Sequence, residues 1–169
     1  VVGPWLFLRP NTWALQCQEK AVKTLENTPH ARLAPLIRLT AKNPQWGAVV
    51  RNSLDEDEWA ILQRQDDGTL RDGSSAQREF VERALVSPDF TVLEGPPGSG
   101  KTTAICELII QLVQRQKRVL LVASTHVAVD NVLERLLDWQ DQSDDKPVLP
   151  VRVGDEFSVT SEKVHPWTL

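Results

Sequence analysis

The sequence predicts an α/β fold with a parallel sheet, and three consecutive segments support this prediction. Residues 90–94 are a short apolar run with β-branched side chains, as in a buried parallel strand. Residues 95–102 are rich in glycine, and residues 104–113 carry apolar side chains at helical spacing. A strand, a glycine loop and a helix in this order predict a P-loop fold.

The loop Gly95-Pro-Pro-Gly-Ser-Gly-Lys-Thr102 has glycines, a lysine and a hydroxyl residue at the spacing that phosphate binding requires. Glycine allows positive φ angles and a close approach of phosphate to the backbone. The N-terminus of the following helix adds N–H groups and a partial positive charge. Because a strand and a helix flank the loop, a mere Gly-Pro turn is the weaker alternative. We therefore expect a nucleoside triphosphate to be bound by Gly95, Pro96, Pro97, Gly98, Ser99, Gly100, Lys101, Thr102 and Thr103.

Lys101 and Thr102 supply the chemistry of this predicted site. We expect the Lys101 amine to reach the β- and γ-phosphates as a point charge, and the Thr102 hydroxyl to bind Mg²⁺. These two residues are therefore the candidate catalytic residues, and Thr102 is the candidate metal ligand.

Residues 1–71 differ from the rest of the chain in their pattern of predicted helices, strands and motifs, and they predict a small α+β accessory module. Helices are expected from Thr12, as the cap, to Asn27 and over residues 35–40. Two strands joined by a solvated acidic loop are expected to follow, over residues 45–51 and 58–64.

Turn-forming residues accumulate between positions 66 and 75 and mark the boundary with a second part, residues 72–169. No motif in the first part carries chemistry, and it is a candidate surface for a partner protein. Its tryptophans favour core or interface roles over stacking on nucleobases. They are Trp5, Trp13, Trp46 and Trp59.

Gln77 lies in the first turn of a helix that is expected from Ser75, as its cap, to Leu85. Two roles are open to its side chain. With Ser74 it fits a reciprocal helix cap, and its amide can also pair with the edge of adenine. The spacing alone does not separate the two.

Gln77, the glycine loop and residues 120–136 together resemble superfamily 1 helicases of the Upf-type branch. The last of these segments is Leu-Leu-Val-Ala-Ser-Thr-His-Val-Ala-Val-Asp-Asn-Val-Leu-Glu-Arg-Leu. The resemblance covers residues 73–154 and implies a RecA-like domain. It also implies that Gln77 reads adenine, that the nucleotide is ATP, and that the protein travels 5′-to-3′ on single-stranded DNA or RNA.

The same resemblance implies that Ser124 and Thr125 contact nucleic-acid phosphates, and His126 is a third candidate. Residues 118–123 predict a strand, which places these side chains at its C-terminal end and at a helix N-terminus. Ligands bind at this position in open α/β sheets. Many family members have Pro-Ser-Asn here, and helix capping or packing is the open alternative for His126.

Four further side chains receive structural roles. Asp130 and Arg135 lie on a helix expected over residues 127–139 and are expected to be solvated or ion-paired. Cys17 and Cys106 have no cysteine or histidine cluster around them, so we expect buried, reduced thiols.

ATP hydrolysis requires a carboxylate for the Mg²⁺ shell and a residue that positions water. Asp155 and Glu156 follow an apolar run, but Arg152 and Gly154 fit a buried strand poorly, so both acids are expected in a loop. Only three strands can follow from Phe90, too few for a complete sheet. We therefore expect an incomplete RecA-like sheet that binds ATP but does not hydrolyse it alone.

The composition excludes little. The net charge is −4, and no basic field indicates nucleic-acid binding. The apolar residues 5–8 are too few to span a membrane and are not preceded by basic residues, so neither a membrane role nor a secretory signal is indicated. The chain has no methionine and is expected to be a piece of a longer protein, located inside the cell in the cytoplasm or nucleus.

These features predict an ATP-dependent helicase or translocase that acts on single-stranded nucleic acid with the remaining helicase domains of its parent protein. The alternative is a degenerate, helicase-like scaffold or regulatory subunit that holds nucleotide without unwinding. An Asp-Glu pair after an apolar strand beyond Leu169 would favour the enzyme.

Overall fold

The computed structural model describes residues 12–27, 30–39, 41–43, 45–48, 50, 53–143, 148–154, 159 and 161–169. The chain divides into two compact units, Val1–Ala48 and Val49–Leu169. Among the described residues, no helix is long and apolar enough to cross a membrane.

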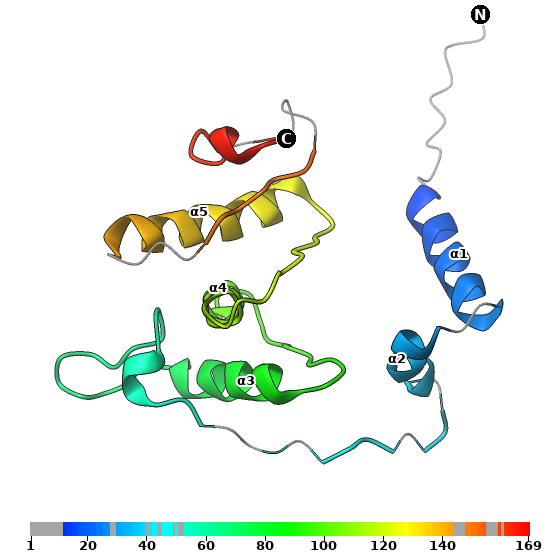
Figure 1. Cartoon of the computed structure of the whole chain (residues 1–169), viewed down its shortest axis with the longest axis horizontal. Helices are drawn as coiled ribbons and strands as arrows, with labels where there is room; N and C mark the ends of the chain where they lie inside the picture. Colours follow the sequence, from blue (N-terminus) through cyan, green and yellow to red (C-terminus); the bar gives the residue numbers. More distant parts are fainter. Residues whose placement is uncertain are drawn as a thin grey trace, which may run out of the picture. The chain divides into compact units, whose positions relative to one another are not determined.

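The first unit contains helix α1 (Trp13–Asn27), the 3-10 turn η1 (Ala31–Leu33) and helix α2 (Ala34–Arg38), drawn in blue in Figure 1. The N–H of Gln16 donates to the carbonyl of Thr12 at 2.9 Å. The helix predicted from Thr12 to Asn27 is therefore confirmed, and α2 falls within the region where a second short helix was expected.

The apolar stripe of α1 consists of Trp13, Cys17, Ala21 and Leu25, of which the first three are exposed and Leu25 is half-buried. None of its side chains is buried, and Trp13 is 70% exposed. Cys17 is exposed as well, so the prediction that its thiol is buried is wrong. The short α2 is the only other α-helix that the structure describes in this unit.

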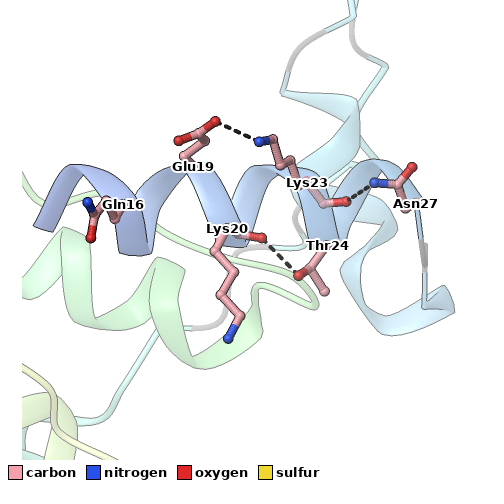
Figure 2. A pocket seen from close by; sticks show the side chains of 6 residues that line it. All are labelled: Gln16, Glu19, Lys20, Lys23, Thr24 and Asn27. Carbon is pink, nitrogen blue, oxygen red and sulfur yellow. Dashed lines mark hydrogen bonds and ion pairs between the residues drawn. The ribbon is translucent and has the colours of Figure 1, made fainter. Parts of the chain in front are cut away.

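A shallow hollow follows one face of α1 and is lined by Gln16, Glu19, Lys20, Lys23, Thr24 and Asn27 (Figure 2). Lys23 Nζ donates to Glu19 at 2.6 Å, and Thr24 Oγ1 donates to the carbonyl of Lys20 at 2.8 Å. Such contacts four residues apart are ordinary on an exposed helix. The hollow is thus the polar surface of a single helix.

The second unit contains the 3-10 turn η2 (Glu56–Glu58), helices α3 (Ser74–Val86), α4 (Lys101–Gln114) and α5 (His126–Gln142), and the turn η4 (His165–Trp167). Helix α4 lies between α3 and α5 and packs against both (Figure 1). The three helices predicted in this part of the chain are confirmed, with small differences at their ends.

Among the described residues, the core of the second unit forms three clusters, two of them beside α4 and a third at α5, made of Leu133, Val159 and Val164. The cluster toward α5 comprises Cys106, Ile109, Ile110, Val132 and Leu136. The cluster toward α3 comprises Leu54, Trp59, Leu62 and Val81. Trp59 is only 2% exposed, as expected for a core tryptophan, whereas Trp46 is 42% exposed and Trp5 lies outside the described residues.

The predicted parallel sheet of an α/β fold is wrong for the part of the chain that the structure describes. Residues 90–94 and 118–123 form neither helix nor strand, and no β-ladder joins either segment to another described one. Val92 is 75% exposed and Leu120 is 87% exposed. A parallel strand needs hydrogen-bonded neighbours and cover on both faces, and the described segments provide neither.

The two strands predicted for the accessory module are also wrong where they are described. Residues 45–48 and 58–64 contain no strand. The acidic run forms η2, and the N–H of Asp55 donates to the Glu58 carboxylate at 2.8 Å. Acidic side chains that bond to nearby backbone N–H groups favour such turns over strands.

The acidic run is not merely solvated, because Glu56 pairs with two arginines. Its carboxylate lies 2.6 Å from Arg78 Nη2 and 3.2 Å from Arg64 Nε. The Arg78 guanidinium, followed by that of Arg64, lowers the pKa of Glu56 to about 2.

Residues 148–154, the orange trace in Figure 1, run along α5. The N–H of Val148 donates to Gln140 Oε1 at 3.0 Å. Further on, Arg152 forms an isolated parallel bridge with Thr168. Asp155 and Glu156, the acids expected in a loop, lie outside the described residues.

Candidate functional site

The glycine loop leads from residues 90–94 into α4, which begins at Lys101. Gly98 and Gly100 have φ angles of 80° and 77°, which glycine adopts without strain. Gly100 is the N-cap, so the first N–H groups of α4 have no acceptor within the helix. A loop of this shape before a helix N-terminus is suited to an anion.

The Lys101 side chain turns back over the loop. Its Nζ donates to the carbonyl of Gly95 at 2.7 Å and to the carbonyl of Pro96 at 2.8 Å. The ammonium charge therefore lies at the loop itself.

Gln77 contacts the same loop from α3. Its Nε2 donates to the carbonyl of Ser99 at 3.0 Å. A Cβ built on Gly100 would lie 2.2 Å from this Nε2, so the amide fits against the glycine. The reciprocal cap with Ser74 is not formed, and neither is the Ser75 cap, because Gly73 is the N-cap of α3 and no side chain caps it.

Thr102 and Thr103 lie in the first turn of α4, and both are partly exposed. Thr103 Oγ1 accepts from Arg135 Nη1 of α5 at 3.2 Å. The Thr103 hydroxyl therefore links two helices. Thr102, the predicted Mg²⁺ ligand, directly precedes Thr103 and is therefore one residue nearer to the glycine loop in the sequence.

Ser124 and Thr125 lie where residues 118–123 meet α5, and both are exposed. Thr125 is the N-cap of α5, and its Oγ1 accepts from the N–H of Ala128 at 3.3 Å. The structure thus brings the predicted nucleic-acid residues to a helix N-terminus, and it gives Thr125 a capping role that the sequence did not predict.

His126 lies beside a buried ion pair. Arg152 Nε and Asp130 Oδ1 are 3.1 Å apart, with side chains 3% and 1% exposed. Arg152 Nη2 lies 3.1 Å from His126 Nδ1. Because a guanidinium can only donate, His126 Nδ1 is the acceptor and its proton resides on Nε2. The prediction that Asp130 is solvated or ion-paired is confirmed by this pair, but the role of Arg152 was missed.

A groove of about 670 Å³ lies between α4, α5 and the segments 117–125 and 148–153. Its lining is mostly apolar and includes Ser124, Thr125 and His126. The predicted nucleic-acid residues therefore line a concave surface. The glycine loop at Gly95–Thr102 is not part of this surface.

Sequence reasoning missed two buried polar residues of α4. Glu107 is 0% exposed and Gln111 is 1% exposed. With Ala104 they occupy positions i, i+3 and i+7, which share one helix face. Polar side chains on a face shared with a buried alanine were the available signal. Cys106, as predicted, is buried, and burial raises its pKa to about 11, so its thiol is unreactive near neutral pH.

Comparisons with known proteins place this geometry in context. The model of a family described as AAA domain matches residues 73–169. The mouse DNA replication ATP-dependent helicase/nuclease DNA2 is 35% identical over 145 residues, which are 85% of this chain and 12% of that protein. The mouse DNA-binding protein SMUBP-2 is 44% identical over 61 residues, which are 36% of this chain and 6% of that protein.

The DNA2 protein of Saccharomyces cerevisiae is 47% identical over 60 residues, which are 36% of this chain and 4% of that protein. The chain therefore spans only a small part of the length of the curated relatives that it matches.

Proposed function

The chain belongs to the AAA domain family of P-loop proteins, as the resemblance to superfamily 1 helicases predicted, and on this basis we propose that it is part of an ATP-dependent helicase or translocase. The proposed substrate is single-stranded DNA or RNA. The observation that carries the proposal is the convergence of Gln77 and Lys101 on one glycine loop.

The residues present fit a nucleoside triphosphate. Gly98 and Gly100 shape a loop before a helix whose first N–H groups have no helical acceptor, and the Lys101 ammonium lies against it. Gln77 adds an amide at the edge of the loop, where it can pair with a base. The positive charge and the free N–H donors suit the triphosphate of ATP, and the amide suits its adenine base.

Lys101 and the loop N–H groups of Gly98–Thr103 would hold the phosphates, while Gln77 would hold adenine. The Thr102 hydroxyl would be a ligand of Mg²⁺, which supplies charge neutralisation at the phosphates when it is bound. The remaining helicase domains of the parent protein would provide the acids and the water-positioning residue.

Ser124, Thr125 and His126 would contact the phosphate backbone of the strand. All three are exposed at the N-terminus of α5, where N–H groups favour anions. His126 Nε2 carries a proton and is available as a further donor. Residues 1–71 would serve a partner protein, and the protein would act inside the cell, in the cytoplasm or nucleus.

The test is ATP turnover by the full-length protein, measured in parallel with single-stranded DNA and single-stranded RNA. We expect turnover to rise with at least one of the two nucleic acids. We expect Lys101→Ala to abolish it, because the phosphates lose their charged partner. Lys20→Ala, on the exposed surface of α1, is the matched control and should leave turnover unchanged.

Intact turnover in Lys101→Ala would show that the loop is not the catalytic site. Nucleotide binding without any turnover, with or without nucleic acid, would favour the scaffold over the enzyme.

A further inference from the structure

Residues Leu54–Leu62, here called the strap, lie across α3 and α4. Leu54, Trp59 and Leu62 are buried with Val81 of α3, and Leu108 of α4 packs against them. The strap comes before the glycine loop in the chain and carries none of the nucleotide-binding motifs. Its polar contacts nevertheless connect the two helices that carry the predicted nucleotide site.

On α4, the buried carboxylate of Glu107 holds the strap by its backbone. Glu107 accepts from the N–H groups of Ala60, Ile61 and Leu62 at 3.1, 2.6 and 2.9 Å. Gln111 Nε2 donates to Glu107 at 2.8 Å. A carboxylate that is 0% exposed must replace its lost hydration with donors, and these four groups do so.

On α3, Arg78 holds the other side of the strap. Its Nε and Nη2 donate to the carbonyl of Leu62 at 2.8 and 2.5 Å. Its two terminal nitrogens form a bidentate pair with Glu56, and the guanidinium lies 4.6 Å from the ring centroid of Trp59. The planar fork of arginine makes these contacts at once, which lysine could not do.

Leu62 is thus bound by both helices, because its N–H reaches Glu107 of α4 and its carbonyl reaches Arg78 of α3. Arg78 is the next residue after Gln77. The strap therefore links the second turn of α3 to the second turn of α4 and so constrains the distance between the two helices.

That distance matters at the loop. Gln77 fits against Gly100 with no space for a Cβ, and its bond to Ser99 is 3.0 Å long. A displacement of α3 relative to α4 would therefore change where the Gln77 amide lies on the loop.

We propose that the strap sets the register of Gln77 on the glycine loop, so that Glu107 and Arg78 are positioning residues for recognition of the adenine base. The proposal rests on the proposed function and assigns nucleotide selectivity to residues remote from the nucleotide. Phosphate recognition depends on the loop and Lys101 and does not depend on the strap.

The experiment measures the affinity of the full-length protein for fluorescent ATP, fluorescent GTP and inorganic tripolyphosphate. Glu107→Gln keeps the side-chain shape but turns one oxygen into an amide that faces N–H donors. We expect about tenfold weaker ATP binding, with unchanged GTP and tripolyphosphate binding. Arg78→Lys keeps the charge without the fork and should act in the same direction. Arg83→Gln, on the exposed side of α3, should change nothing.

Two further measurements separate positioning from a general loss of structure. Hydrogen exchange without nucleotide should become faster at Ala60–Leu62 and in α3 of Glu107→Gln, while α5 keeps its protection. Gln77→Ala combined with Glu107→Gln should lose no more selectivity than Gln77→Ala alone.

Equal weakening of ATP, GTP and tripolyphosphate by both strap variants would overturn the proposal, as would unchanged selectivity in either folded variant. Wild-type protein that binds no ATP or tripolyphosphate would instead refute the proposed function. Wild-type protein that binds both, yet does not prefer ATP over GTP, would refute adenine reading and the strap proposal with it.

Discussion

The side-chain amide of Gln77 lies 3.0 Å from the backbone carbonyl of Ser99, which joins the start of α3 to the glycine loop across 22 positions of sequence. Of its two predicted roles, the reciprocal cap with Ser74 is absent, and pairing with adenine stays a prediction; the contact with Ser99 was not predicted. This leaves the amide beside the predicted phosphate site, where a base would be within reach of its remaining donor and acceptor.

Gly100→Ala should weaken ATP binding by about tenfold or more, because its Cβ would lie 2.2 Å from Gln77 Nε2 and would expel the amide. The left-handed φ of 77° adds strain of about 1–2 kcal/mol. Gly68→Ala is the matched control, since its φ is 79° and nothing lies within 4 Å of the added Cβ. Nucleotide titrations of both variants would test this, and equal losses of affinity would contradict the steric explanation.

The buried pair of Asp130 and Arg152 should be costly to break. Asp130→Asn or Arg152→Met should each destabilise the chain by about 3–5 kcal/mol, because one buried charge loses its partner. The double variant should cost less than the sum of the two. Urea unfolding followed by tryptophan fluorescence gives these values. Lys163→Met, which removes the exposed pair with Asp138, should have little effect, and strictly additive losses would show that Asp130 and Arg152 do not interact.

The lowered pKa of Glu56 predicts that the folded protein loses stability in acid. Its pKa is about 2 in the folded protein against an ordinary 4.5, so its contribution is complete above about pH 4.5 and is lost as the pH falls toward 2. Glu56→Gln should therefore flatten the decline of stability over this range. Arg64→Gln should keep most of the decline, because Arg78 is the larger cause of the shift. Unfolding midpoints measured from pH 5 to pH 2 decide the matter, and an unchanged slope in Glu56→Gln would contradict the prediction.

Local patterns predicted the helices well. Apolar residues at helical spacing located α4, and the glycine loop lies directly before it as expected. These features depend on residues close together in the chain, which is why their spacing is informative. The family membership also rests on a local motif, and it is confirmed by the matched family model.

Pairing between distant segments was not predicted correctly. The apolar runs 90–94 and 118–123 were assigned to a sheet, yet a strand exists only when another segment supplies its hydrogen bonds. Glu107 was missed for a related reason, since the N–H groups that it binds lie 45 to 47 residues earlier. Helical spacing can show that Glu107 lies on a buried face, but no local pattern in the sequence identifies the distant backbone groups that it binds.

The contacts of Lys101 with the carbonyls of Gly95 and Pro96 have a consequence for nucleotide affinity. A free lysine side chain loses about 2 kcal/mol of rotamer entropy when it is ordered. Here the contacts with the loop have already ordered the Lys101 side chain, so phosphate binding does not carry this entropic cost. In return, the phosphate must displace two carbonyl oxygens from the same ammonium group. The two loop carbonyls thus compete with the phosphate for the Lys101 ammonium group, and they keep this side chain aligned until the more negative phosphate replaces them.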